Sequence, residues 1–301
     1  MLYAKRLINT KTYDCVLAIC QPIYIARILR RIELRVPVII YKVDPWHTNY
    51  YLDYENELKE ERLFDRMASA ILMHPTVFVD YAADGYTEFV HKTFTVEYPS
   101  VYRRADGVRQ KKKDGSIICA FVGNLYSAIR SPEYTIRLFA ELADANIELH
   151  FVGGGTGMED RHNLPDNVKI YDSVTNDMAV ETMLDADVLV NIGNTVTNQL
   201  PSKLFEYISL GKPILNIFKI PDCPTLPYTA KYPLALDVFE TELPIRADVD
   251  RVKDFILSKR GKTLPFSQVE AIYYDCTPEY VGERVYRVLL DTIDDGAHSK
   301  E

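Results

Sequence analysis

Short apolar runs rich in β-branched residues alternate with amphipathic segments along this chain, and that alternation restricts the possible folds more than any other feature. The runs at 15–20, 36–43 and 116–126 have the length and composition of buried strands. Parallel sheets covered by helices on both faces produce this pattern, because their strands are buried on both sides. The sequence therefore predicts an α/β protein with doubly wound, Rossmann-like sheets.

The expected elements follow one another in strand-helix order. Strands are predicted at 15–20, 36–43, 69–75, 94–99, 116–126, 147–155, 168–174, 187–194 and 212–218. Helices are predicted at 23–34, 54–67, 78–86, 132–143, 177–185, 202–211 and 278–293. Neither an internal repeat nor a low-complexity tract interrupts this order, so a solenoid is excluded.

The length of the chain and one charged segment predict two domains. The chain has 301 residues, and domains usually contain about 100 to 200 residues. The segment 103–115 lacks apolar periodicity and is rich in basic residues, which is the composition of a linker. We therefore expect a partial amino-terminal Rossmann-like domain at 1–105, a linker at 106–115, a second Rossmann-like domain at 116–265 and a carboxy-terminal helical segment at 266–301.

Composition excludes several classes of protein. With 35 Lys and Arg against 43 Asp and Glu, the net charge is -8, so we expect no chain-wide binding of nucleic acid. The 5 cysteines are scattered, and neither they nor the His and Asp residues show metal-ligand spacing, so no metal or other cofactor is expected. No apolar run approaches the roughly 20 residues of a membrane-spanning helix, and the start does not resemble a signal peptide. We therefore expect a cytoplasmic protein.

Glycines follow two strands of the second domain, at the edge where open parallel sheets bind ligands. Gly123 and Asn124 end one strand, and Gly153 and Gly154 end the next. A glycine there lets a phosphate approach backbone N–H groups without a Cβ in the way. Neither segment matches a P-loop or a full G-x-G-x-x-G motif, so the alternative that these glycines only form tight turns stays open.

The stretch NQLPSKLFEYISLGKPIL at 198–215 carries the most chemical information. Pro201 and Ser202 are expected to begin a helix, with Ser202 as its cap, so that free N–H groups face an anion. Lys203 in the first turn opposes the helix dipole unless an anion lies nearby. The Glu206 carboxylate can accept two hydroxyl hydrogen bonds, as from a ribose. The alternative is a surface Lys and Glu on an ordinary helix.

This stretch, with ADVLVNIGN and VKIYDSVTND before it, resembles the donor domain of retaining glycosyltransferases with the two-Rossmann GT-B architecture. The resemblance is to bacterial enzymes of cell-surface polysaccharide and capsule assembly, and it covers 117–218 more strongly than the first domain. It implies transfer of a sugar from a nucleotide-diphosphate sugar to a polysaccharide or lipid-linked acceptor. It also implies retention of configuration, with no metal or other cofactor.

The resemblance further implies roles for the charged residues. Glu206 matches the glutamate that binds the nucleotide ribose, and the turn at 201–203 matches the segment around the diphosphate. Arg130 is the candidate for the basic residue that contacts the phosphates after the first donor loop. Arg130 and Lys203 would then meet the negative charge that develops on the leaving diphosphate, so both are candidate catalytic residues.

Other positions of the donor site follow from the same resemblance. Gly123 and Asn124 match the first donor loop. The loop from Tyr171 to Val174 lies where the base usually packs. Asn198 occupies the place where many of the resembling enzymes carry a second glutamate, which contacts the sugar. This departure bears on the identity of the sugar and on catalytic competence.

The first domain offers two more candidates in KVDPWH at 42–47. In the resembling enzymes the corresponding loop faces the cleft between the domains. Asp44 and His47 are therefore candidate catalytic residues that contact the acceptor or the sugar. The alternative is structural, with Asp44 capping a turn before Pro45 and Trp46 packed in the core.

The first domain is also expected to be shortened, because its first strand at 15–20 resembles one from the middle of the family's acceptor domain. This leaves a second function open: a non-catalytic nucleotide-sugar-binding subunit, or a degenerate homologue, that supports a partner glycosyltransferase. Asn198 and the shortened domain favour it. An open sheet edge in the first domain would favour a partner subunit or a homodimer.

Basic residues gather on one face of the first predicted helix. Arg27, Arg30 and Arg31 follow i, i+3, i+4 spacing, and Arg35 is close to them in sequence. One hypothesis is that this face contacts anionic lipid or a lipid-diphosphate acceptor, which would make the protein peripheral at the inner face of the cell membrane. The alternative is a solvated basic face without a ligand.

Overall fold

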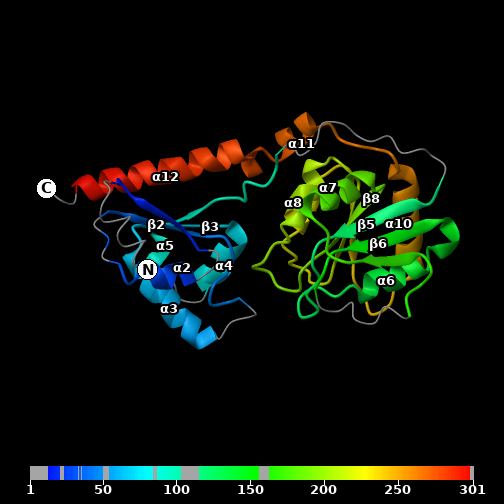
Figure 1. Ribbon diagram of the computed structural model, residues 1–301, viewed down its shortest axis with the longest axis horizontal. Coiled ribbons are helices and arrows are strands. Elements are labelled where there is room, and N and C mark those ends of the chain that lie inside the picture. Colours follow the sequence, from blue (N-terminus) through cyan, green and yellow to red (C-terminus); the bar gives the residue numbers. More distant parts are fainter. Residues whose placement is uncertain are drawn as a thin grey trace. The chain divides into compact units, whose positions relative to one another are not determined.

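A computed structural model describes the chain at 13–20, 24–32, 34, 36–49, 54–83, 87–102, 115–155 and 163–298. The predicted linker at 106–115, apart from Gly115, lies outside these ranges, as does Arg35. The chain divides into two compact units, Met1–Pro99 with Asp275–Glu301, and Ser100–Tyr274. Each unit contains a parallel sheet with helices packed on it (Figure 1), so the predicted α/β class is confirmed.

The first unit contains a 4-stranded parallel sheet with the order β1-β2-β3-β4. Its strands are β1 (Val16–Ile19), β2 (Val38–Lys42), β3 (Ala70–Met73) and β4 (Thr93–Thr95). Its helices are α2 (Tyr24–Leu29), α3 (Tyr54–Met67), α4 (Pro75–Ala83), α5 (Thr87–Val90) and α12 (Pro278–His298). Helix α4 begins directly after β3, earlier than the predicted 78, because proline suits the first helical position.

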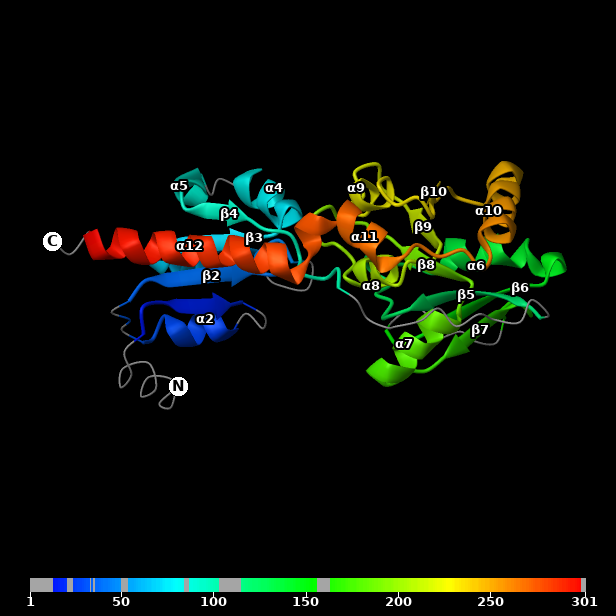
Figure 2. The same cartoon turned by 90° about the horizontal axis from the view of Figure 1, so that it is seen from above.

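Helices cover the two faces of the first sheet by different routes. Each successive strand is added on the same side, so right-handed crossovers place the connecting helices on one face. Val38 and Ile40 on that face pack with residues of α2, α3 and α4. Ile39 and Leu72 point to the other face and pack with Val281 of α12. Figures 1 and 2 show α12 lying along this sheet, so the carboxy-terminal helix supplies cover that the crossovers do not provide.

The second unit contains a 6-stranded parallel sheet with the order β10-β9-β8-β5-β6-β7. Its strands are β5 (Ile117–Val122), β6 (Ile147–Val152), β7 (Val168–Tyr171), β8 (Val188–Ile192), β9 (Ile214–Phe218) and β10 (Ala235–Phe239). Its helices are α6 (Glu133–Ala140), α7 (Asn176–Asp185), α8 (Lys203–Ser209), α9 (Leu226–Thr229), α10 (Arg246–Lys259) and α11 (Phe266–Ile272). The elements from β5 to β9 confirm the predicted ones. The segment from α9 to α11 lies where the sequence analysis assigns no element.

The strand order of the second sheet reverses at β5. The chain runs outward through β6 and β7 on one side, returns to β8, and then runs outward through β9 and β10 on the other. The predicted doubly wound arrangement is therefore confirmed for this unit. Crossovers leave in opposite directions at the β5–β8 boundary, and open sheets of this type bind ligands at such a switch point.

Candidate functional site

The loops after β5 and β6 touch backbone to backbone at the carboxyl edge of the second sheet. A Cβ at Gly153 would lie 2.0 Å from Gly123 O, and a Cβ at Gly155 would lie 1.8 Å from Leu125 O. Both glycines have positive φ, at 144° and 110°. No other residue fits these two positions, so the glycines are required for the packing of the loops.

The backbone N–H groups of the predicted phosphate loops already have partners inside the protein. Gly123 N donates to Val152 O at 2.9 Å, and Gly153 N donates to Tyr171 O at 3.3 Å. Gly154 N donates to Asn124 Oδ1 at 3.1 Å. These three N–H groups hold the loops together, which fits the alternative that the glycines form tight turns.

Arg130, on the loop after β5, joins that loop to the loop after β8 at the switch point. Its Nε and Nη2 donate to Asn194 Oδ1 at 3.0 and 2.7 Å, and its Nη1 donates to Asn124 O at 3.2 Å. Asn194 is buried and donates in turn to Gln199 O at 2.7 Å. The guanidinium is thereby held in one orientation at the carboxyl edge of the sheet.

Helix α8 brings Lys203 and Glu206 to the same edge. Lys203 Nζ lies 2.9 Å from Glu206 Oε2, and both side chains are partly exposed. A Cβ at Gly123 would lie 3.5 Å from Lys203 Cγ, which places Lys203 against the loop after β5. The structure therefore brings two cations and one carboxylate of the predicted set to the switch point.

Ser202 does not cap α8, contrary to the prediction. Its φ of -61° and ψ of -28° are helical, and its side chain makes no capping hydrogen bond. Leu204 N donates to Pro201 O, and Phe205 N donates to Ser202 O, each at 3.2 Å. Because these turns satisfy the first N–H groups, the start of α8 offers fewer free donors than a capped helix would.

The other predicted donor-site residues lie in the segments that follow β7 and β8. Tyr171, at the end of β7, is exposed, and the centroid of its ring lies 5.3 Å from that of the His150 ring. Val174 follows in the same loop, which reaches the Gly154 segment: a Cβ at Gly154 would lie 2.8 Å from Ser173 Oγ. Asn198, in the segment before Pro201, is buried. The exposed ring of Tyr171 is thus the surface on which an aromatic ligand group could stack.

In the first unit, the predicted residues Asp44 and His47 lie in the loop after β2, and they differ in accessibility. Asp44 is partly buried, and burial raises the pKa of its carboxyl group. His47 is buried, with its Nδ1 2.5 Å from Glu61 Oε2 and its backbone N donating to the same oxygen at 3.0 Å. Trp46 is also buried and donates to Glu57 Oε2 at 2.6 Å. His47 and Trp46 therefore anchor this loop.

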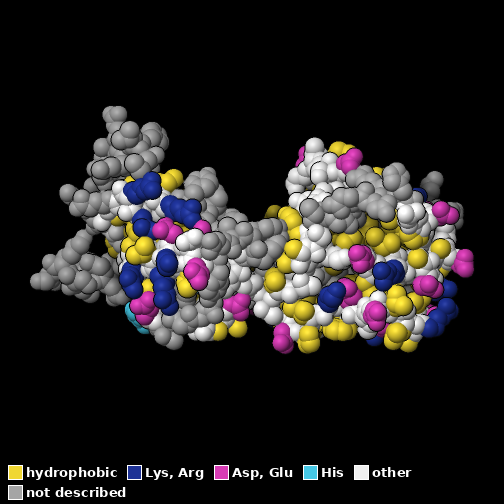
Figure 3. All heavy atoms as spheres, turned by 90° about the horizontal axis from the view of Figure 1, so that it is seen from below, with side chains coloured by type: hydrophobic (Ala, Val, Ile, Leu, Met, Phe, Trp, Pro, Cys, Tyr) yellow, Lys and Arg dark blue, Asp and Glu magenta, His cyan; other side chains and the backbone are white. Residues whose placement is uncertain are grey.

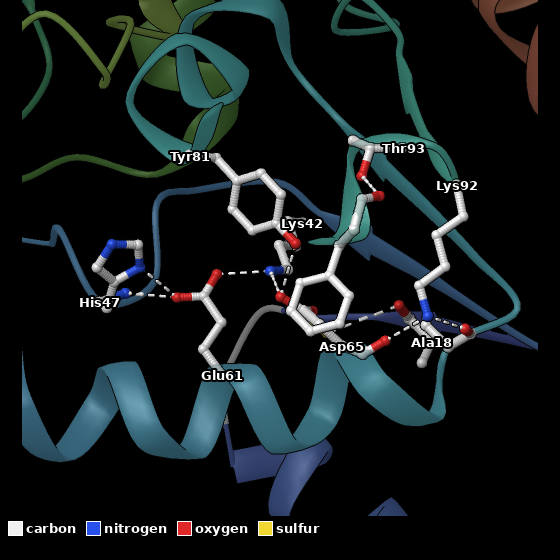
Figure 4. Close-up of polar contacts among 11 residues, drawn as sticks. Ala18, Lys42, His47, Glu61, Asp65, Tyr81, Lys92 and Thr93 are labelled. Carbon is white, nitrogen blue, oxygen red and sulfur yellow. Dashed lines mark hydrogen bonds and ion pairs between the residues drawn. The ribbon is translucent and has the colours of Figure 1, made fainter. Parts of the chain in front are cut away.

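A buried charge network behind that loop was not anticipated from the sequence (Figure 4). Lys42 Nζ lies 2.5 Å from Glu61 Oε1 and 2.7 Å from Asp65 Oδ2, and the Tyr81 hydroxyl donates to Asp65 Oδ2 at 2.9 Å. Burial opposes ionisation of Glu61, but Lys42 and His47 outweigh it and lower the pKa of Glu61 to about 2. Burial and the nearby Glu61 charge raise the pKa of Asp65 to about 6, despite Lys42.

The structure adds Asn194 and Tyr207 to the candidate donor site. Asn194 belongs to the segment 193–202, which the sequence places after a strand at the ligand-binding edge, but no role was predicted for it. For the buried network, the signal was the four-residue spacing of Glu57, Glu61 and Asp65, which places three carboxylates on one face of α3. Tyr207 carried no such signal, because an aromatic residue at that helical position reads as core.

The helix predicted at 23–34 ends at Leu29, so of the predicted basic face only Arg27 lies on α2, and Arg30 and Arg31 follow its end. Arg27 and Arg30 both pair with acidic residues of α3. Arg27 Nη2 lies 2.5 Å from Glu57 Oε1, and Arg30 Nη1 lies 2.6 Å from Glu60 Oε2. Figure 3 shows acidic side chains among the basic ones on this side of the first unit.

No helix within the described ranges is long and apolar enough to cross a membrane. Among the same residues, His, Cys, Asp and Glu form no group of three or more that could hold a metal ion.

No protein-family model and no curated protein sequence matches the chain. Solved structures do resemble it. Anabaena Alr3699/HepE in complex with UDP is 13% identical with a TM-score of 0.65, over 96% of this chain and 81% of that one. The lipopolysaccharide outer core galactosyltransferase WaaB is 14% identical with a TM-score of 0.55, over 100% and 79%. A structure of accessory secretory proteins 1, 2 and 3 from Streptococcus pneumoniae is 13% identical with a TM-score of 0.59, over 99% and 57%.

These similarities establish the fold. The chain has the GT-B architecture of glycosyltransferases, with Rossmann-like parallel sheets, as the resemblance of its donor-domain motif implies. Because the identities are low, they do not by themselves assign an activity.

Proposed function

We propose that this protein is a glycosyltransferase that binds a nucleotide-diphosphate sugar at the switch point of its second unit. The observation that carries the proposal is the convergence of Arg130, Lys203 and Glu206 at the carboxyl ends of β5 and β8. Two cations beside a carboxylate match a ligand that combines phosphates with hydroxyl groups. The solved structure of HepE, which has the same fold, contains UDP, and this supports a nucleoside diphosphate as the ligand class.

The geometry suggests how the donor would be held. A diphosphate would accept hydrogen bonds from the Arg130 guanidinium, which Asn194 orients, and from Lys203 Nζ. The Glu206 carboxylate would accept hydrogen bonds from ribose hydroxyls while it stays near Lys203. As the bond between sugar and diphosphate breaks, negative charge grows on the leaving group, and the two cations stabilise it.

The finer parts of the proposal extend the family resemblance. We propose transfer with retention of configuration, without a metal, to a polysaccharide or lipid-linked acceptor of the cell surface. The likeness to the galactosyltransferase WaaB supports this acceptor class. In the first unit Asp44 would contact the acceptor or the sugar, and its raised pKa suits a carboxyl group that exchanges a proton.

A second candidate function is a nucleotide-sugar-binding subunit that supports a partner glycosyltransferase. Two observations favour it: Asn198 stands where the resembling enzymes carry a glutamate, and one similar structure contains accessory secretory proteins 1, 2 and 3 together. Under this proposal the switch point still binds the nucleotide. Turnover would then require the partner.

A thermal-shift screen tests both functions. The protein is heated with UDP, GDP, ADP, CMP and their sugars, with and without EDTA. A ligand at about 100 times its dissociation constant adds about 2.7 kcal/mol of stability, which is a visible shift. Selective stabilisation by one nucleoside diphosphate, unaffected by EDTA, supports the donor site, and hydrolysis or transfer of its sugar by the protein alone identifies an enzyme. Binding without turnover favours the subunit, and stabilisation by none of the ligands contradicts both.

A further inference from the structure

Tyr207 of α8 reaches the end of β5, and its hydroxyl bonds both backbone groups of a single residue there. Val122 N donates to the hydroxyl oxygen at 2.8 Å, and the hydroxyl donates to Val122 O at 3.0 Å. Both residues are buried, with Tyr207 at 1% exposure, so water does not replace these bonds. One side-chain hydroxyl therefore provides the two bonds that a neighbouring strand provides elsewhere in a sheet.

The topology of the sheet explains why Val122 needs a partner from outside the strands. β5 pairs with β6 along its whole length, but with β8 only at Cys119 and Ala120. Asp187 N, just before β8, donates to Ile118 O at 2.7 Å. Because every second residue of a strand directs its backbone groups to the same side, Val122, like Ile118, directs its N–H and C=O groups towards β8. At Val122 the two strands no longer pair, and the Tyr207 hydroxyl takes the place of β8 there.

Tyr207 connects the two halves of the candidate donor site. On its own helix it follows Glu206 directly and lies one turn after Lys203. At the other end of its hydrogen bonds, Val122 directly precedes Gly123, which touches Lys203. The hydroxyl thus fixes how far along β5 the start of α8 lies.

We propose that Tyr207 is a positioning residue for donor binding. Its hydroxyl sets the distance between the loop after β5, which carries Arg130, and the α8 residues Lys203 and Glu206. A nucleoside diphosphate that spans these groups would lose contacts if α8 shifted along β5. The ligand class in this inference rests on the proposed function, whereas the link between α8 and β5 rests on the structure alone.

The test compares two tyrosines that differ in position but not in chemistry. Tyr207→Phe removes only the hydroxyl. Tyr232→Phe is the matched control, because its buried hydroxyl donates to Lys212 O at 2.9 Å, before the amino end of β9 and so at the opposite edge of the sheet. Tyr207→Phe leaves two buried backbone groups without their partner and Tyr232→Phe leaves one, so both are expected to lower Tm. Calorimetric titration with the nucleoside diphosphates is done at a temperature at which circular dichroism shows both variants to be folded.

We expect Tyr207→Phe to weaken nucleoside diphosphate binding at least tenfold, and Tyr232→Phe to change it less than twofold. Hydrogen–deuterium exchange, measured without ligand on peptides covering 117–126, should become at least tenfold faster in Tyr207→Phe and stay unchanged in Tyr232→Phe. Equal affinities in the two variants would overturn the positioning role. If the unmodified protein binds no nucleoside diphosphate, the proposed function fails. The link between α8 and β5 is tested separately: unchanged exchange at 117–126 in Tyr207→Phe would overturn it.

Discussion

Lys203 and Glu206 form an ion pair at the start of α8, with Nζ 2.9 Å from Oε2. Both side chains are partly exposed, and a pair of this kind contributes only about 0 to 1 kcal/mol to stability. The pair nevertheless lies at the switch point of the sheet, with Lys203 against the loop after β5. Their contribution is therefore expected in ligand binding more than in folding.

Replacing Glu206 with Ala should weaken binding of the nucleoside diphosphate with little effect on stability. Loss of a charged hydrogen bond to a ribose corresponds to about 1.5 to 3 kcal/mol, or about a 10- to 150-fold change in affinity. Calorimetric titration measures the affinity and thermal unfolding the stability. Glu141→Ala, at an exposed position after α6, is the control and should change neither. Unchanged affinity in Glu206→Ala would contradict the assignment of Glu206 to the ligand.

Replacing Arg130 with Ala should separate phosphate binding from base binding. We expect affinity for the nucleoside diphosphate to fall by about 10-fold or more, because a charged hydrogen bond is lost. Affinity for the corresponding nucleoside should change less than about twofold, since the guanidinium pairs with charge. Arg137→Ala on α6 is the control, because that side chain is exposed and donates to Glu242 O. If Arg130→Ala lost the same affinity for the nucleoside as for the nucleoside diphosphate, Arg130 would act by holding the loops in place and not by binding phosphate.

Replacing Lys42 with Met should destabilise the first unit strongly, because Glu61 and Asp65 lose their buried cation. Breaking a buried pair by removal of one partner costs about 3 to 5 kcal/mol. Trp46 is the single tryptophan and is buried in this unit, so its fluorescence during urea unfolding reports the first unit selectively. Lys59→Met, at an exposed position of α3, should change stability by less than about 0.5 kcal/mol. Equal midpoints for the two variants would contradict the role of the network.

The same network predicts how the stability of the first unit depends on pH. The pKa of Glu61 is lowered to about 2, so its contribution is present above its unfolded pKa of about 4.3 and is lost as pH falls towards 2. The pKa of Asp65 is raised to about 6, so between about pH 4 and 6 the folded state binds the extra proton. Stability should therefore decrease as pH rises through this window, by on the order of 3 kcal/mol.

The Asp65→Asn variant isolates the second effect. An amide does not ionise, so the variant should lose the decrease between about pH 4 and 6 and keep the decrease towards pH 2 that Glu61 causes. Urea unfolding followed by Trp46 fluorescence at several pH values measures both. If the variant and the unmodified protein showed the same slope between pH 4 and 6, another group would be responsible.

Most secondary structure from β1 to β9 follows from local pattern, because strands and helices differ in the spacing of their apolar residues. Of the elements that the sequence analysis does not assign, some have a weaker pattern and one has a clear helical pattern. β10 lies at the edge of its sheet and includes Asp237, so it lacks a continuous apolar run. Helix α10 does carry helical spacing at Val249, Val252 and Ile256, a signal that sufficed to predict it.

The candidate donor site was predictable in part for a topological reason. Gly123 and Arg130 follow one strand and Lys203 and Glu206 follow another, and the carboxyl ends of parallel strands share an edge. The bonding of the glycine N–H groups and the helical conformation of Ser202 were not predictable. These details depend on how loops distant in sequence pack against each other.

The sequence by itself determined the α/β class, the order of most elements and the residues at the ligand-binding edge, because these depend on local spacing and on strand direction. The tertiary structure decided which distant groups meet. It placed Lys42 between two carboxylates of α3, covered the first sheet with α12, and inserted the Tyr207 hydroxyl where β5 and β8 separate. Local periodicity specifies which face of an element is apolar. The partner of that face, and of each buried polar group, is set only when the whole chain is packed.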